Sequence, residues 1–199
     1  MGFKFCWCWP CALLLRGQDF VYDQQSATSE PRPMGVETPI QTQQPIGQSF
    51  VPNLSSIGFI RFYLDDQTAN GVGATVVLNL WSGSIGSGTL LASTDPIFIP
   101  HGFFDYSNFF FSTPVILTPS STYYLQAFIQ SGDNDNNMRT GELPGSAYPN
   151  GTAFISSVAS PGIDLWFREG VVVPEPSTAL LALFGIAGLC LHRNKFNRH

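Results

Sequence analysis

The middle of the chain alternates between hydrophobic and polar residues over short stretches. Residues 56–64 place Ile60, Phe62 and Leu64 on one face of an extended strand, and residues 74–81 repeat the alternation. A period of two residues is typical of a β-strand that is buried on one face. Further strands are predicted at residues 89–93, 97–99, 108–112, 115–117, 123–130, 153–157 and 164–168.

Eight or nine short strands, separated by Gly, Pro and Asn turns, predict an all-β fold of the jelly-roll β-sandwich kind. The composition agrees, because 17 Phe, 19 Gly and 15 Pro in 199 residues favour strands joined by turns. This length suits one domain. We place the sandwich at residues 47–170. The Gln- and Thr-rich lead-in at residues 19–46 is expected to be irregular, apart from a possible edge strand around residues 20–22.

Residues 171–199 follow a different pattern. Pro174, Glu175 and Pro176 precede Ser177, and an uncharged apolar run then extends over residues 179–191. Because the prolines disfavour helix before them and Ser177 can cap one, a helix is predicted to begin there. Residues 177–191 would form a helix of about 22 Å, against about 30 Å for a bilayer core. We therefore predict one short transmembrane helix, marginal as a permanent span.

The charges after this helix predict its orientation. Arg193, Lys195 and Arg198 lie close to the end of the chain, and positive residues hold such a segment in the cytoplasm. The sandwich should then lie outside the cytoplasmic membrane. A plain tail anchor and a buried core helix are the alternatives. The core helix is disfavoured because residues 179–191 have no polar face.

The sequence V-P-E-P-S-T, an apolar run with spaced glycines and a basic chain end resemble the PEP-CTERM sorting signal of exported bacterial proteins. The resemblance implies that Pro174, Glu175 and Pro176 are a recognition motif. It also implies that an exosortase, a membrane transpeptidase-like enzyme, cleaves nearby and passes the protein to the envelope or an extracellular polysaccharide matrix. The final cluster H-R-N-K departs from the family's usual run of adjacent arginines.

The first residues have the shape of a secretory signal. Within residues 1–18, Lys4 precedes an apolar stretch that ends in three leucines, but no A-x-A cleavage site follows. We predict a degenerate export signal, with a misplaced start codon as the alternative. Cys6, Cys8 and Cys11 have no fourth metal ligand nearby, so a metal cluster there is disfavoured.

The charge of the middle excludes one class of partner. From residue 24 to residue 170 the chain has eleven acidic and four basic residues. Binding to phosphate backbones needs clustered Lys and Arg, so nucleic acid is not an expected partner.

Catalytic chemistry finds little support in the sequence. The middle contains one histidine, His101, and neither G-x-S-x-G nor H-E-x-x-H occurs. The adjacent Asp65 and Asp66 would point to opposite faces of a strand, which does not suit a glycosidase pair, and a turn is expected there. We expect no enzymatic activity and no bound cofactor, with a hydrolase as a distant alternative.

Two stretches favour binding. Asp133, Asp135 and Asn137 offer oxygen ligands at alternate positions, as in the start of a calcium loop, although the later Gly and Glu of an EF-hand are missing. A simple polar loop is the competing interpretation. An aromatic cluster near His101, which consists of Phe103, Phe104, Tyr106, Phe109, Phe110 and Phe111, is the second, and Trp81 and Trp166 could face outward as well. Exposed rings could stack on sugars, which would make the sandwich a carbohydrate-binding module, whereas core packing is the competing interpretation for most of them.

We therefore expect an exported protein of the envelope or of a polysaccharide matrix, anchored in the membrane at least transiently. Its expected partners are the sorting enzyme, the membrane and, in the alternative, a polysaccharide.

Overall fold

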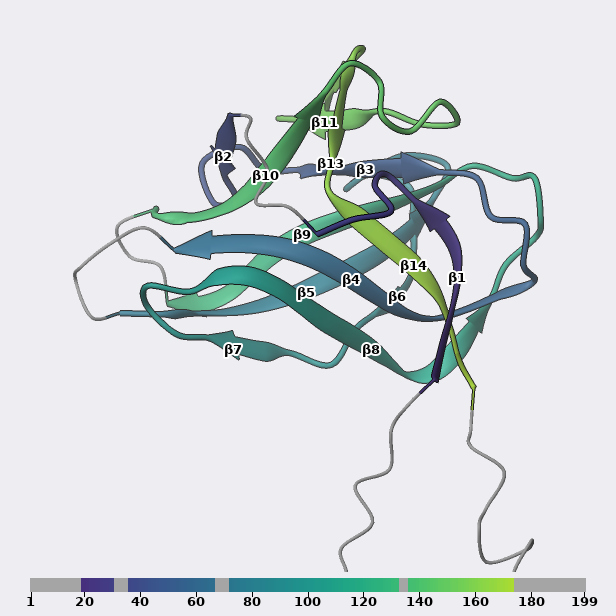
Figure 1. The fold of residues 1–199 in the computed structure, drawn as a ribbon, viewed down its shortest axis with the longest axis horizontal. Helices are drawn as coiled ribbons and strands as arrows, with labels where there is room; N and C mark the ends of the chain where they lie inside the picture. Colours follow the sequence, from purple (N-terminus) through teal and green to yellow (C-terminus); the bar gives the residue numbers. More distant parts are fainter. Residues whose placement is uncertain (1–18, 31–35, 67–71, 133–135, 174–199) are drawn as a thin grey trace, which may run out of the picture. The chain divides into compact units, whose positions relative to one another are not determined.

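The structure is a computed structural model that describes residues 19–30, 36–66, 72–132 and 136–173. All regular elements in these ranges are β-strands, which form two antiparallel sheets (Figure 1). The prediction of an all-β fold is thus confirmed, and its finer assignment as a jelly roll stays a prediction. The predicted C-terminal helix lies outside the described residues.

Sheet 1 is built around β4, which pairs with β8 along one edge and with β14 and β10 along the other. β1 lies beside β14 and forms an edge of the sheet (Figure 1). The strands of sheet 1 are β1 (Asp19–Gln25), β2 (Glu37–Pro39), β4 (Ser56–Asp66), β8 (Phe104–Ile116), β10 (Met138–Pro144), β13 (Ile163–Leu165) and β14 (Phe167–Val173).

Sheet 2 is centred on β9, which pairs with β3 on one side and with β5 on the other. β6 and β7 follow one another along the far side of β5 and form that edge of the sheet. The strands of sheet 2 are β3 (Ile46–Phe50), β5 (Ala74–Ser82), β6 (Thr89–Ser93), β7 (Ile97–Ile99), β9 (Tyr123–Gly132), β11 (Ala153–Ile155) and β12 (Val158–Ser160).

The core is formed by the apolar faces of both sheets. Ile60, Phe62 and Leu64 of β4 belong to the same buried cluster as Leu78 and Leu80 of β5, each at most 1% exposed. Burying one such side chain contributes about 1.5–3 kcal/mol to folding. The alternation seen in the sequence therefore places these residues inside, as predicted.

The expectation of an irregular lead-in is corrected. Residues 19–46 contain β1 and β2, and β1 extends sheet 1. The N–H of Ser26, next to β1, donates to the Phe167 carbonyl at 3.0 Å, and the Phe167 N–H donates to Ser26 Oγ at 2.9 Å. Gln24 and Ser26 are both 5% exposed. The possible edge strand at residues 20–22 lies within β1, and the strand extends beyond it because polar residues fill the next buried positions through hydrogen bonds.

The strand boundaries differ from the sequence prediction in two further places. Residues 108–112 and 115–117 fall almost entirely within one long strand, β8, which contains a bulge. Asp65 and Asp66 end β4, where they are 1% and 3% exposed, so the turn expected there is wrong. β4 continues past its last apolar residue because β8 and β10 pair with its two final aspartates.

The absence of a side chain at Gly47 allows β3 and β9 to approach closely. A Cβ atom at this position would collide with the backbone carbonyl of Leu125, and it would also meet the Ile85 side chain. We expect Gly47→Ala to lower the free energy of unfolding by about 1–3 kcal/mol, as overpacked cores do. Urea denaturation followed by circular dichroism measures this.

Gly58→Ala is the matched control for this substitution. Its Cβ would meet nothing closer than the Val172 nitrogen at 3.5 Å, an ordinary contact. Equal stabilities of the two variants would contradict the close approach of β3 and β9.

Candidate functional site

The outer face of sheet 1, which points away from the core, carries an aromatic ladder. The strand register places Phe59 of β4 opposite Phe110 of β8, and Tyr63 opposite Tyr106. The ring centroids lie 6.4 Å and 5.3 Å apart, respectively. Residues directly opposite on antiparallel strands share a face and stabilise each other. We call this surface the aromatic face; its residues are Phe20, Tyr22, Phe59, Arg61, Tyr63, Phe104, Tyr106, Asn108, Phe110, Trp166 and Arg168.

Two arginines in the aromatic face share one carboxylate. Arg61 of β4 lies opposite Arg168 of β14, where like charges would repel. Glu30 relieves this repulsion, because its carboxylate accepts from Arg61 Nε at 2.7 Å and Nη2 at 2.9 Å, and from Arg168 Nη1 at 3.2 Å. Arg61 also donates to Asn108 Oδ1 at 3.0 Å. Hydrogen bonds from Arg61 lower the pKa of Glu30 and, reciprocally, raise the pKa of Arg61.

The rings of the aromatic face differ in exposure. Phe104 is 61% exposed and Tyr22 is 38% exposed, whereas Tyr106 is half-buried. Burial raises the pKa of Tyr106 to about 12, so its hydroxyl stays protonated at neutral pH. Arg61 lies over the Tyr106 ring at 5.6 Å. The face therefore offers flat rings next to hydrogen-bond donors.

The two predicted stacking residues differ in their exposure. Trp166 is fully buried, so the prediction that it faces outward is wrong. Its ring packs 4.1 Å from that of Tyr106, Arg168 covers it at 5.1 Å, and its Nε1–H donates to the Ser29 carbonyl at 3.3 Å. The segment at residues 26–30 covers this ring, which the sequence of β14 alone could not indicate.

Trp81 lies on sheet 2. It is half-buried, and its Nε1–H donates to the Gln126 side-chain oxygen at 2.8 Å. Gln126 belongs to β9 and in turn donates to Gln44 at 2.9 Å. The polar edge of the indole is thus held by its neighbours, and a sugar-stacking role for Trp81 stays a prediction.

A buried carboxyl group lies on the core side of sheet 1. Glu169 of β14 is fully buried, and neither of its oxygens has a hydrogen-bond partner of ordinary geometry within the described part of the chain. Burial, with a further contribution from the charge of Asp23, raises the pKa of Glu169 to about 9. The backbone of Gln24 lowers the pKa by less than burial raises it, so the carboxyl is neutral at physiological pH, as expected for a buried acid without a basic partner.

The remaining candidates from the sequence are not brought together. His101 lies exposed in the turn between β7 and β8. Asp133 and Asp135 lie outside the described residues, while Asn137 is half-buried just before β10. Over the described ranges, no three His, Cys, Asp or Glu side chains are placed to hold a metal ion. The calcium prediction stays untested.

The sorting segment begins where the sandwich ends. β14 extends to Val173, and Pro174 follows it directly in the sequence. Residues 172–194 match the family model of the PEP-CTERM protein-sorting motif. The chain carries a PEP-CTERM sorting motif. This motif marks an exported protein of the cell envelope that an exosortase-type enzyme recognises.

The matched segment covers the predicted recognition residues and part of the basic tail. Pro174, Glu175, Pro176 and Arg193 fall within it, while Lys195 and Arg198 lie beyond its end. All of these residues lie outside those the structure describes. No curated protein matches the chain. Among the described residues, no helix has the length and hydrophobicity needed to span a bilayer.

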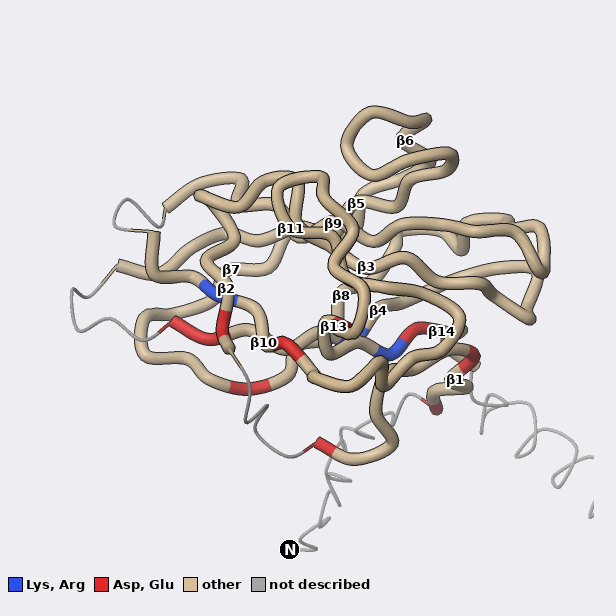
Figure 2. The backbone as a smooth tube through the Cα atoms, turned by 90° about the horizontal axis from the view of Figure 1, so that it is seen from above, with Lys and Arg blue, Asp and Glu red and all other residues tan. Residues whose placement is uncertain are grey.

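Three of the aromatic residues around His101 occupy outward positions of β8. Phe104, Tyr106 and Phe110 recur at even positions in β8, and each lies opposite an outward residue of β4. This alternation was visible in the sequence, but it was obscured because Phe109 and Phe111 fill the other face of the strand. Charged residues are few over the whole sandwich, as Figure 2 shows, so aromatic rings dominate its chemistry.

Glu169→Gln tests the protonation of the buried carboxyl. The pKa of Glu169 is 4.5 before burial and about 9 in the folded chain. Its contribution to stability is therefore complete below about pH 4.5, and it is lost as the pH rises through about 9, at up to about 1.4 kcal/mol per pH unit. We expect the variant to gain melting temperature relative to the native chain, increasingly so from pH 5 to pH 9.

Glu30→Gln is the control with the opposite trend. Because Arg61 lowers the pKa of Glu30, that carboxylate stabilises the fold above its unfolded pKa, and the contribution is lost on acidification. Its variant should be less stable than the native chain at pH 7 and equal to it at low pH. A Glu169→Gln difference that does not change with pH would contradict a neutral Glu169.

Proposed function

We propose that this protein is sorted to the cell envelope or to an extracellular polysaccharide matrix, where its sandwich acts by binding and not by catalysis. The PEP-CTERM match at residues 172–194, which begins at the end of the last strand of the sandwich, carries this proposal. The exposed turn position of His101 gives no support to a hydrolase.

The tail that follows suits a temporary anchor. The apolar run at residues 179–191 is short for a bilayer core of about 30 Å, and basic residues follow it. A marginal span holds the chain at the membrane while the sorting enzyme acts. Removal of this segment then releases the sandwich to the envelope or the matrix.

Mass spectrometry of the sorted chain tests this proposal. The tagged full-length chain is expressed in a host with an exosortase-type enzyme and in the same host lacking that enzyme. We expect loss of the residues beyond the motif only in the first host. The double variant Pro174→Ala/Pro176→Ala should keep its tail there. An intact tail in both hosts, or a full-length chain that is soluble in the cytosol, would overturn the proposal.

Binding of a polysaccharide through the aromatic face is the second candidate. Flat rings stack on the apolar faces of sugars, and exposed aromatic patches mark interaction sites. Phe104 and Tyr106 are successive outward residues of β8, about 7 Å apart along a strand that rises about 3.4 Å per residue. Asn108 and Arg61 supply donors beside these rings. Glu30 offsets much of the arginine charge, so the face suits neutral or weakly acidic chains.

Phe104→Ala tests the aromatic face with little risk to folding, because the ring is 61% exposed. Phe98→Ala is the matched control, since this phenylalanine is 64% exposed but lies on β7 of sheet 2. We expect Phe104→Ala to weaken retention on cellulose or alginate by about three- to tenfold, as the loss of one aromatic contact would. Equal retention of both variants would exclude the aromatic face as the binding surface.

A further inference from the structure

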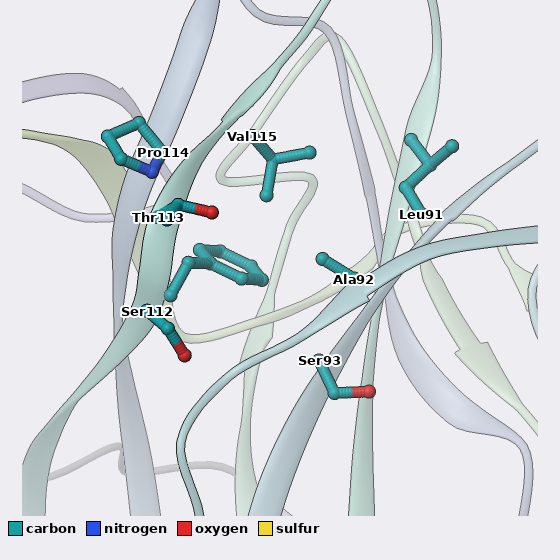
Figure 3. Close-up of a pocket in the computed structure, with 8 residues that line it drawn as sticks. Leu91, Ala92, Ser93, Ser112, Thr113, Pro114 and Val115 are labelled. Carbon is teal, nitrogen blue, oxygen red and sulfur yellow. The ribbon is translucent and has the colours of Figure 1, made fainter.

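A hollow lies between the edge strands of the two sheets. It is lined by Leu91, Ala92 and Ser93 of β6 and by residues 111–115 of β8, and its volume is about 290 Å³. Figure 3 shows Thr113 and Val115 on one side and Leu91 and Ala92 on the other. This volume is at the lower limit for small-molecule sites, so it fits a single ring and not a folded partner.

Both strands bulge at this place. In β8, the residues from Phe111 to Pro114 occupy the stretch where β4 has only Gly58, because Ile57 pairs with Val115 and Phe59 with Phe110. In β6, Leu91 is an extra residue between the partners of Leu80 and Trp81. Bulges bend a strand, re-aim its side chains and are frequent beside functional sites. These two bulges lie on either side of the hollow and separate the edge strands of the two sheets there.

The same features argue against a β-strand as the occupant. β6 has five residues and contains a bulge, and short, bulged edges resist pairing with further strands. Pro114 in the bulge of β8 has no backbone N–H to donate. The hollow is therefore suited to a small ligand.

The lining combines apolar and hydroxyl groups without a charged side chain. Ser93 donates its hydroxyl proton to Asn79 Oδ1 at 2.6 Å, and Ser112 donates to Asp95 Oδ1 at 2.8 Å. With their protons engaged, both serine oxygens remain acceptors for a ligand. The exposed Thr113 hydroxyl has no hydrogen bond to the described residues and can both donate and accept.

We propose that this hollow binds one neutral sugar ring of a polysaccharide, which deepens the binding role proposed above. A pyranose presents C–H groups on its faces and hydroxyls around its edge, and these match the two kinds of lining. Leu91, Pro114 and Val115 contact the C–H groups, while Thr113 and the two serine oxygens bind the hydroxyls. A charged ligand would find no counter-charge in the lining, and a purely apolar one would leave the hydroxyls unpaired.

Saturation-transfer NMR on the full chain, kept in a detergent without sugar groups, tests this proposal. The probes are the neutral tetrasaccharides of glucose, mannose and galactose, with trigalacturonate as the charged comparison. Leu91→Trp fills the hollow, and in a Phe104→Ala background, which removes the contribution of the aromatic face, we expect it to abolish transfer to the neutral sugars. Leu90→Trp is the matched control, because its neighbouring position on β6 does not line the hollow. Thr113→Val should weaken binding about fivefold, as expected for one neutral hydrogen bond.

The outcomes separate this site from the proposed function. Transfer that survives Leu91→Trp but is lost in Phe104→Ala would overturn the hollow as the site and leave polysaccharide binding to the aromatic face. Transfer from none of the neutral probes, or equal transfer from trigalacturonate, would overturn the proposal for this hollow. Removal of the tail by the sorting enzyme is measured in a separate experiment, so its result does not depend on whether the hollow binds a sugar.

Discussion

The sandwich depends on β4 being covered on both faces. Its inward side chains, Ile60, Phe62 and Leu64, lie in the core shared with sheet 2. Its outward rings, Phe59 and Tyr63, are also at most 1% exposed, although they lie on the solvent side of the sheet. Strands of an antiparallel sheet usually have one face that is exposed to solvent. Here the side chains of Phe20, Tyr106 and Phe110, from the other strands of sheet 1, pack against these rings and bury them.

This double burial explains which parts of the fold the sequence could predict. The inward positions of β4 and β5 are occupied by apolar residues that alternate with outward ones. This pattern predicted both strands to within two residues of their observed ends. β3 was missed because Gln48 lies in its centre, where it donates to Asp164 at 2.8 Å and accepts from the Leu165 N–H at 2.8 Å. A polar residue that is buried with its partners breaks the hydrophobic pattern. Its partners lie more than a hundred residues away.

The two proposed binding surfaces show that sequence reasoning has the same limit for exposed side chains. A ring's exposure depends on what packs over it, and Trp166 is buried by a segment 137 residues earlier in the chain. The sorting motif could be predicted because its recognition is local, requiring only a short run of residues in order. The two β8 surfaces could not, because they depend on a register and on bulges that only pairing with β4 creates. Sequence reasoning therefore identified the export signal more readily than a candidate binding surface.

The pairing of β1 with β14 joins the first and the last strand of the sandwich, and Ser26 and Phe167 are 141 residues apart. Contacts between such distant residues form late, because the intervening chain must first be ordered. A polypeptide crossing a membrane from its N-terminus therefore cannot close sheet 1 until β14 has emerged. The last strand of the sandwich therefore decides when sheet 1 is complete.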